Sequence, residues 1–151
     1  MSTHIIYIGL GSNLGDGAHN LDAALMMLQS EVGEVLYTSA YIESEPWGFD
    51  SPHTFTNAVT VLRSQLDPMT VLDVTHDIER KMGRTHKRRH GEAYRDRVID
   101  IDILTYDDLT MDTERLTLPH PHISDRDFVR LPLLECQQAL SRRPNNTISK
   151  Q

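Results

Sequence analysis

The apolar and polar residues of the chain follow two periods, which together predict a β-α-β-β-α-β order of elements. Short apolar segments of strand length alternate with longer segments whose apolar residues recur every three or four positions. The strands are expected at residues 4–10, 34–42, 56–62 and 98–106. This order is typical of an α+β fold of the ferredoxin-like, split βαβ type, an antiparallel sheet with helices packed on one face.

The two helices of this unit have recognisable starts. The first is expected over residues 18–32, where Asp16 can cap the first turn and Gly33 can end the helix. The second is expected to begin at Asp67-Pro68, because a capping carboxylate followed by proline is typical of helix starts. Beyond the unit, the sequence predicts a short strand near residues 116–118 and a last helix that follows a proline, through the segment LLECQQAL.

Length and composition favour a single globular domain over residues 1–151. The chain has 151 residues, of which 38% are hydrophobic and 25% charged, as in ordinary folded domains. No apolar stretch reaches the length of about 20 residues that a membrane helix needs, and the first residues do not resemble a secretory signal. Cys136 is the only cysteine, so no internal disulfide can form, and we expect a reducing cytoplasmic location.

The charge of the chain is unevenly distributed. The formal net charge is −7, which argues against a general nucleic-acid binder. Residues 84–97, however, contain six of the 15 Lys and Arg residues and only two of the 22 Asp and Glu residues. An acidic body with one basic segment suggests a small polyanionic ligand bound at one place. The alternative is a solvated charged loop.

The segment around Asp100 and Asp102 is the most informative for chemistry. In a strand these two side chains share one face, about 7 Å apart, and two neighbouring carboxylates repel each other unless a cation lies between them. Mg²⁺ prefers carboxylate oxygens and commonly bridges to phosphates. Arg97 can join the two aspartates only if the strand begins after it. The alternative is an edge strand with its acids in solvent.

Arginines close to these carboxylates indicate phosphate chemistry. Arg84 follows the end of the second predicted helix, and the planar guanidinium group binds phosphate with two hydrogen bonds. Metal-binding carboxylates preceded by arginines are typical of phosphoryl transfer. The P-loop and dinucleotide motifs are absent, since Leu14 stands where a third glycine would be needed. A nucleotide site in this chain must therefore use another arrangement.

Histidine and aromatic residues suggest two further contacts. His120 is a candidate for a neutral side chain next to a phosphate group. The alternatives are zinc binding by His120 and His122, or an exposed histidine. Trp47, Phe55 and Phe128 each lie near polar loop residues, as a flat heteroaromatic ligand would require. Ordinary core packing is the alternative for these three rings.

Taken together, these segments resemble the 6-hydroxymethyl-7,8-dihydropterin pyrophosphokinase family of folate biosynthesis. The resemblance runs over nearly the whole chain and depends on several motifs in the same order. These are GLGSNLGD (9–16), YIESEPWGF (41–49), FTNAV (55–59), ERKMGR (79–84), RVIDIDIL (97–104), LTLPHPHISDRDFV (116–129) and PLLE (132–135). Ser44 departs from the family pattern, in which threonine is usual.

The resemblance implies a reaction, two substrates and a set of site residues. ATP would donate its β,γ-diphosphate to the hydroxymethyl oxygen of the pterin and leave as AMP, and two Mg²⁺ ions would be bound by Asp100 and Asp102. The residues that match the pterin-binding positions are Gly11, Ser44, Glu45, Trp47, Phe55, Asn57 and Phe128. The residues that match the nucleotide-binding positions are Glu79, Arg84, Arg97, His120 and Arg126, of which Arg84 and Arg97 are also catalytic candidates with the two aspartates.

Two other classes of function remain open from the residues alone. The split βαβ architecture also occurs in RNA-binding modules and in non-catalytic regulatory domains, because a fold does not determine a function. RNA binding predicts exposed aromatic residues on the central strands, where this sequence has aspartates. The family resemblance implies a monomer, while the acidic net charge and the lack of a long apolar stretch predict that the protein binds neither nucleic acid nor a membrane.

Overall fold

The computed structural model describes residues 2–45, 54–83 and 98–142. In chain order, its elements are β1 (His4–Ser12), α1 (Gly17–Glu31), β2 (Glu34–Thr38), β3 (Ile42–Ser44), β4 (Phe55–Ser64), α2 (Pro68–Lys81), β5 (Asp100–Tyr106), β6 (Met111–Asp112), β7 (Thr117–Leu118) and α3 (Asp127–Ser141). The described helices include none long and apolar enough to cross a membrane.

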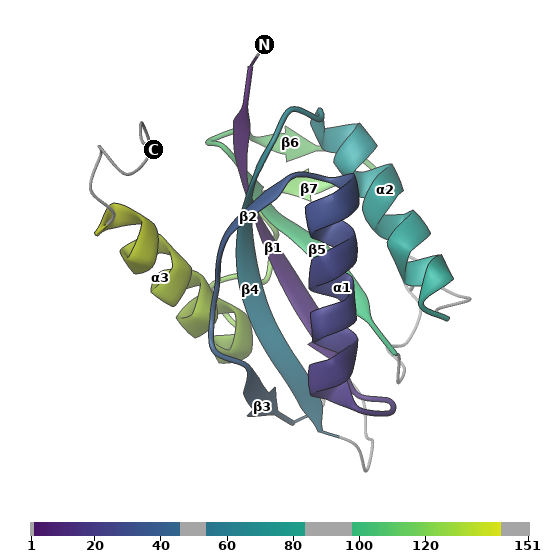
Figure 1. Ribbon diagram of the computed structural model, residues 1–151. Helices are drawn as coiled ribbons and strands as arrows, with labels where there is room; N and C mark the ends of the chain where they lie inside the picture. Colours follow the sequence, from purple (N-terminus) through teal and green to yellow (C-terminus); the bar gives the residue numbers. More distant parts are fainter. Residues whose placement is uncertain (1, 46–53, 84–97, 143–151) are drawn as a thin grey trace.

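The main sheet is antiparallel, with the strand order β2-β4-β1-β5, and β3 also pairs with β4 (Figure 1). The short strands β6 and β7 pair with each other in a separate small sheet. The order of strands and helices along the chain, with β1 and β4 at the centre of the sheet, confirms the predicted ferredoxin-like class.

Helices α1 and α2 cover one face of the sheet (Figure 1), above the larger hydrophobic core. The alternate β1 residues Ile6 and Ile8 point into this core, and so do Ile101 and Ile103 of β5. The helices contribute buried apolar residues that include Leu21, Leu28, Val71 and Ile78. Because residues two apart in a strand share a face, the residues between them in β1 and β5 face the other side of the sheet.

Helix α3 packs on the opposite face (Figure 1), where a second cluster includes Val59, Val61, Leu104, Leu133 and Cys136. The expectation of helices on one face therefore holds for α1 and α2, while α3 forms a third layer. The reason lies in β4, whose residues are almost continuously buried. A strand with apolar side chains on both faces needs cover on both.

Most predicted element ends lie within two residues of those in the structure, but two predictions differ by more. The strand expected at 34–42 is divided into β2 and β3, and α3 begins at Asp127, before Pro132 rather than after it. Proline lacks a backbone N–H, but its φ angle suits a helix, and Pro132 lies inside α3 as a buried residue. The predicted caps are confirmed, since Asp16 accepts the N–H of His19 and Asp67 accepts that of Thr70.

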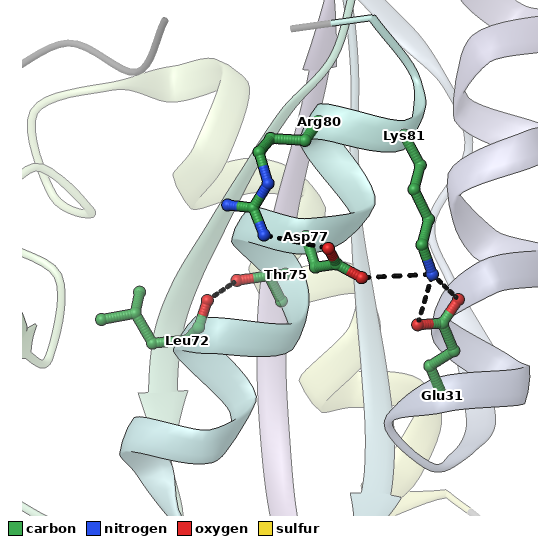
Figure 2. Close-up of polar contacts among 6 residues, drawn as sticks. All are labelled: Glu31, Leu72, Thr75, Asp77, Arg80 and Lys81. Atoms are coloured by element: carbon green, nitrogen blue, oxygen red, sulfur yellow. Dashed lines mark hydrogen bonds and ion pairs between the residues drawn. The ribbon is translucent and has the colours of Figure 1, made fainter. Parts of the chain in front are cut away.

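Polar contacts connect the ends of α1 and α2 (Figure 2). Lys81 Nζ lies 3.4 Å from Glu31 Oε1 and 3.1 Å from Asp77 Oδ2, and Arg80 donates to Asp77 at 2.9 Å. Hydrogen bonds from Lys81 and Arg80 lower the pKa of Asp77. Within the helix, the buried Thr75 hydroxyl donates to the carbonyl oxygen of Leu72. Of these contacts, the Lys81–Glu31 ion pair links the C-terminal ends of α2 and α1, and the others lie within α2.

Candidate active site

Asp100 and Asp102 lie on the same face of β5, as their spacing predicts. Ile101 and Ile103, which alternate with them, belong to the core under α1 and α2. Leu104, two residues after Asp102, belongs instead to the cluster under α3. The two half-buried aspartates therefore face the side of the sheet on which α3 lies.

Two glycines of β1 lie beside these carboxylates. Asp102 pairs with Gly9 and Asp100 with Gly11. Because opposite residues in antiparallel strands share a face, β1 offers no side chain next to either aspartate. A Cβ atom placed on Gly11 would lie 3.3 Å from Oδ1 of Asn57 on β4. The face therefore has a strip of bare backbone, with two carboxylates on one side and an amide on the other.

The Asn57 amide is held in one orientation by its neighbours. Asn57 is only 4% exposed, and its Nδ2 donates to Ser44 Oγ at 2.8 Å and to the carbonyl oxygen of Phe55 at 3.4 Å. Ser44 of β3 pairs with Phe55 of β4, and the Phe55 ring lies 3.6 Å from the Cβ position of Gly11. The fold thus brings together four residues that the resemblance assigns to pterin binding.

His120 lies against β5, where its backbone N–H donates to a carbonyl oxygen at 2.8 Å. Its Nδ1 accepts the N–H of His122 at 3.1 Å, so Nε2 carries the proton in the neutral ring. Burial lowers the pKa of His120; Asp102 and Asp100 oppose this shift, and Arg126 adds to it. The neutral form therefore predominates at pH 7, and His120 lies within electrostatic reach of both aspartates and of Arg126.

The start of α3 brings a cation and a ring to this side of the sheet. Arg126 precedes the first residue of α3, and its guanidinium carbon lies 5.9 Å from the centroid of the Phe128 ring, within the range of a cation–π contact. Because α3 begins earlier than predicted, Phe128 is held in its first turn rather than in a loop. Both residues were predicted to bind substrates.

Glu79 approaches the strand of the two aspartates from α2, on the face of the sheet opposite α3. This α2 residue is only 2% exposed, and its Oε2 accepts the N–H of Ile101 at 2.7 Å. Ile101 lies between the two aspartates, so Glu79 fixes the backbone that carries them. Its predicted contact with the nucleotide stays a prediction.

Several predicted site residues cannot be placed. Trp47, Arg84 and Arg97 lie outside the described residues, as does the basic segment to which the two arginines belong. Glu45 is exposed at the end of a described range. The sequence reasoning missed Gly9, although its two-residue spacing from Gly11 matches the spacing of the aspartates and was a usable signal.

The donor atoms of this site suit magnesium in the presence of phosphate. In the described ranges, no group of three or more His, Cys, Asp and Glu side chains could hold a metal ion. Two carboxylates are nevertheless the donor set with which Mg²⁺ is commonly bound when substrate phosphates and water complete its shell. Asp100 and Asp102 therefore fit a magnesium site that forms together with a nucleotide.

A separate cleft of about 610 Å³ lies beside the N-terminal end of α1. Its lining is polar and includes Asp16, Tyr41, Glu43 and Thr56. None of the predicted site residues that the structure describes is among the residues lining this cleft.

Curated relatives place the protein in the class of pyrophosphokinases, the ATP-dependent diphosphotransferases. The proteins named 2-amino-4-hydroxy-6-hydroxymethyldihydropteridine pyrophosphokinase from Porphyromonas gingivalis and Methylorubrum extorquens are 53% and 41% identical to it, each over 130 residues. These matches cover 85% of this chain and 88% and 80% of the relatives. The Bacillus subtilis protein of that name is 36% identical over 137 residues, 89% of this chain and 80% of its own.

The family model for 7,8-dihydro-6-hydroxymethylpterin-pyrophosphokinase matches residues 7–138. The chain belongs to this family of folate biosynthesis, as the sequence motifs indicated, and the predicted class of enzyme is confirmed. ATP is the co-substrate of these enzymes, and they bind ATP and pterin substrates.

Solved structures agree on the fold. A Plasmodium falciparum HPPK-DHPS structure with pterin and p-hydroxybenzoate matches with a TM-score of 0.69 at 18% identity, over 88% of this chain. An HPPK-DHPS structure in complex with substrates matches with a TM-score of 0.70 at 14% identity, over 87% of this chain. This chain spans only 38% and 39% of those two longer chains.

Proposed function

We propose that this protein transfers the β,γ-diphosphate of ATP to the hydroxymethyl oxygen of 6-hydroxymethyl-7,8-dihydropterin, with release of AMP. The observation that carries the proposal is that Asp100 and Asp102 share one face of β5. They pair with the two glycines of β1 that form the strip of bare backbone. Asn57 lies on the other side of that strip. A carboxylate pair next to an amide and an aromatic ring suits a metal-bound polyphosphate beside a flat heterocycle.

Asp100 and Asp102 are the residues that would hold two Mg²⁺ ions. When bound, the ions neutralise phosphate charge and align the chain of phosphates. The side chains proposed to hold the nucleotide itself are Glu79, Arg84, Arg97, His120 and Arg126. Neutral His120 can donate a hydrogen bond from Nε2 to a phosphate oxygen without repelling the arginines, while each arginine can offer two parallel hydrogen bonds.

The pterin is proposed to lie at the end of the sheet where β3 and β4 pair. Its ring would stack on aromatic side chains, and its polar edge would be recognised by the amide of Asn57. The proposed contact residues are Gly11, Ser44, Glu45, Trp47, Phe55, Asn57 and Phe128. Gly11 matters here because any side chain at this position would meet Asn57.

The reaction is proposed as an in-line attack of the hydroxymethyl oxygen on the β-phosphorus. The oxygen–phosphorus bond forms and the hydroxyl proton passes to water, while the bond from the β-phosphorus to the α-phosphate oxygen breaks, so that AMP is the leaving group. The protein aligns the two substrates and neutralises developing charge. Arg84 and Arg97 are the proposed catalytic cations, and no residue is assigned the role of general base.

The test is to replace Asp100 and Asp102 singly by Ala and to measure AMP formation from ATP and the hydroxymethylpterin across Mg²⁺ concentrations. We expect Mg²⁺-dependent turnover to be abolished in both variants. The fold should be retained, because both side chains are half-buried at the surface of the sheet and outside its core. Asp112→Ala is the matched control, since Asp112 is exposed in β6, and it should behave as the wild type.

Full activity in both Asp100 and Asp102 variants would contradict the metal assignment. Loss of activity with loss of the folded far-ultraviolet circular dichroism spectrum would show instead that the aspartates serve the fold.

We further propose that residues 1–151 form one pyrophosphokinase domain that acts as a cytoplasmic monomer, without nucleic acid or membrane partners. The acidic net charge supports the absence of nucleic-acid binding. Light scattering coupled to size exclusion would test the monomer, with the mass expected near 17.2 kDa.

A further inference from the structure

The chain forms a bulge between β2 and β3, the strand that carries Ser44. Three residues, 39–41, lie opposite only two residues of β4 between the pairs that end β2 and begin β3. Ser39 holds the chain at this point: its N–H donates to the carbonyl oxygen of Val59 at 2.9 Å, and its Oγ accepts the Val59 N–H at 3.0 Å. The Ser39 hydroxyl thus accepts a hydrogen bond in place of a backbone carbonyl oxygen. The next residue, Ala40, is left outside the backbone pairing with β4.

Glu135 of α3 binds the backbone that the bulge releases. Its two carboxylate oxygens lie 3.2 and 3.3 Å from the N–H of Ala40, and Oε2 also accepts the hydroxyl of Tyr37 at 2.9 Å. The hydrogen bond to Glu135 is the main cause of a raised Tyr37 pKa. Glu135 therefore attaches residues on either side of Ser39 to one point on α3.

The chain after the bulge reaches the proposed pterin site within four residues. β3 resumes at Ile42 and places Ser44 Oγ 2.8 Å from Nδ2 of Asn57. With its nitrogen engaged by Ser44 and by the Phe55 carbonyl, Asn57 directs its oxygen toward Gly11. The position of β3 therefore determines the orientation of this amide.

We propose that Glu135 is a positioning residue for pterin binding, which acts from α3 through Ala40 and β3 on the Ser44–Asn57 pair. Glu135 is half-buried and has no place in the proposed reaction, so its effect passes through the backbone. The inference rests on the proposed function, because it assigns the pterin to the Ser44–Asn57 end of the sheet. It also links that end to the helix whose start carries Phe128.

The test measures steady-state kinetics of the full chain with Glu135→Ala and Glu135→Gln. Loss of a hydrogen bond to a charged acceptor changes a binding constant about tenfold. The KM of the alanine variant for the pterin should therefore be about tenfold higher than that of the wild type. KM for ATP and kcat should stay within about twofold of the wild type. The glutamine variant keeps one acceptor oxygen for Ala40. Its KM for the pterin should therefore lie between those of the wild type and the alanine variant.

Tyr37→Phe is the matched control, because it removes the phenol bond to Glu135 and leaves the Ala40 contact. Its KM for the pterin should match that of the wild type. Amide hydrogen exchange of Ala40, measured by nuclear magnetic resonance, should accelerate in Glu135→Ala and stay slow in Tyr37→Phe.

A melting temperature that falls in Glu135→Ala while the pterin KM is unchanged would overturn the inference and leave a structural role only. If the alanine variant does not fold, an unchanged pterin KM in Glu135→Gln overturns it equally. Wild-type protein that forms no AMP overturns the proposed function and this inference together. Active wild-type protein with unaltered variants overturns this inference alone.

Discussion

Buried polar side chains in this protein mainly serve backbone groups. Glu79 accepts the N–H of Ile101, the Ser64 hydroxyl donates to the carbonyl oxygen of Val32, and Cys136 Sγ donates to that of Val59. A buried polar group without a partner costs about 1–3 kcal/mol, so such contacts determine where a polar residue can be tolerated inside. Each of these side chains joins two elements that are distant in sequence.

Cys136 provides a test of this arrangement. Its side chain is completely buried, and burial raises the pKa of the thiol to about 12. Because the thiolate is the reactive form, we expect negligible reaction with a disulfide reagent at pH 8 in the folded protein and rapid reaction in denaturant. Labelling followed by mass spectrometry measures both rates. Equal rates in the two conditions would contradict the burial of Cys136 between α3 and the sheet.

The glycine that connects α1 to β2 is required by a contact with another strand rather than by the helix it follows. The sequence predicts that Gly33 ends the helix by its conformational freedom. In the structure α1 ends at Glu31 with Val32 as its C-cap, and Gly33 is needed for a close approach instead. A Cβ atom at Gly33 would lie 2.2 Å from the carbonyl oxygen of Arg63 at the end of β4. The absence of a side chain at Gly33 therefore allows the two backbones to approach closely.

Gly33→Ala should consequently destabilise the fold. The added methyl meets rigid backbone, and overpacking of this kind costs about 1–3 kcal/mol, so the free energy of unfolding should fall by that amount. Denaturation by urea, followed by circular dichroism, measures it. Gly9→Ala is the matched control: its Cβ would lie 3.4 Å from a flexible Leu104 side chain, and the loss should be much smaller. Equal losses would contradict the explanation by backbone contact.

The molecule consists of three layers, and the proposed site lies on the face that α3 only partly covers. Along β5, Leu104 packs in the cluster under α3, whereas Asp102 and Asp100 lie beyond it and are half-buried. The same helix supplies Phe128 in its first turn and Glu135 in its third. The third layer therefore both completes the second core and borders the site.

Ligand binding to this face should stabilise the whole fold. A ligand that binds only the native state at 100 times its Kd adds about 2.7 kcal/mol. We expect a non-hydrolysable ATP analogue with Mg²⁺ to raise the melting temperature of the wild type, but not that of an Asp100→Asn, Asp102→Asn double variant. Differential scanning fluorimetry measures the shift, and EDTA should remove it. An equal shift in the double variant would contradict nucleotide binding through these aspartates.

Much of this architecture is determined by local sequence patterns. Two-residue alternation places Asp100 and Asp102 on one face of a strand, and the caps Asp16 and Asp67 begin their helices where expected, because both effects depend on neighbours within a few residues. The family motifs likewise identified the class of enzyme. Roles that depend on Trp47, Arg84 and Arg97 stay predictions.

Only the tertiary structure decided which distant residues meet. That Gly9 and Gly11 pair with the two aspartates depends on strand register, and that α3 covers the second face depends on the burial of β4 from both sides. The contact of Glu135 with Ala40 joins segments 95 positions apart, and nothing within either segment specifies the other. Periodicity and capping act over a few residues along the chain, whereas pairing and burial are settled by the packing of the main sheet against α1, α2 and α3.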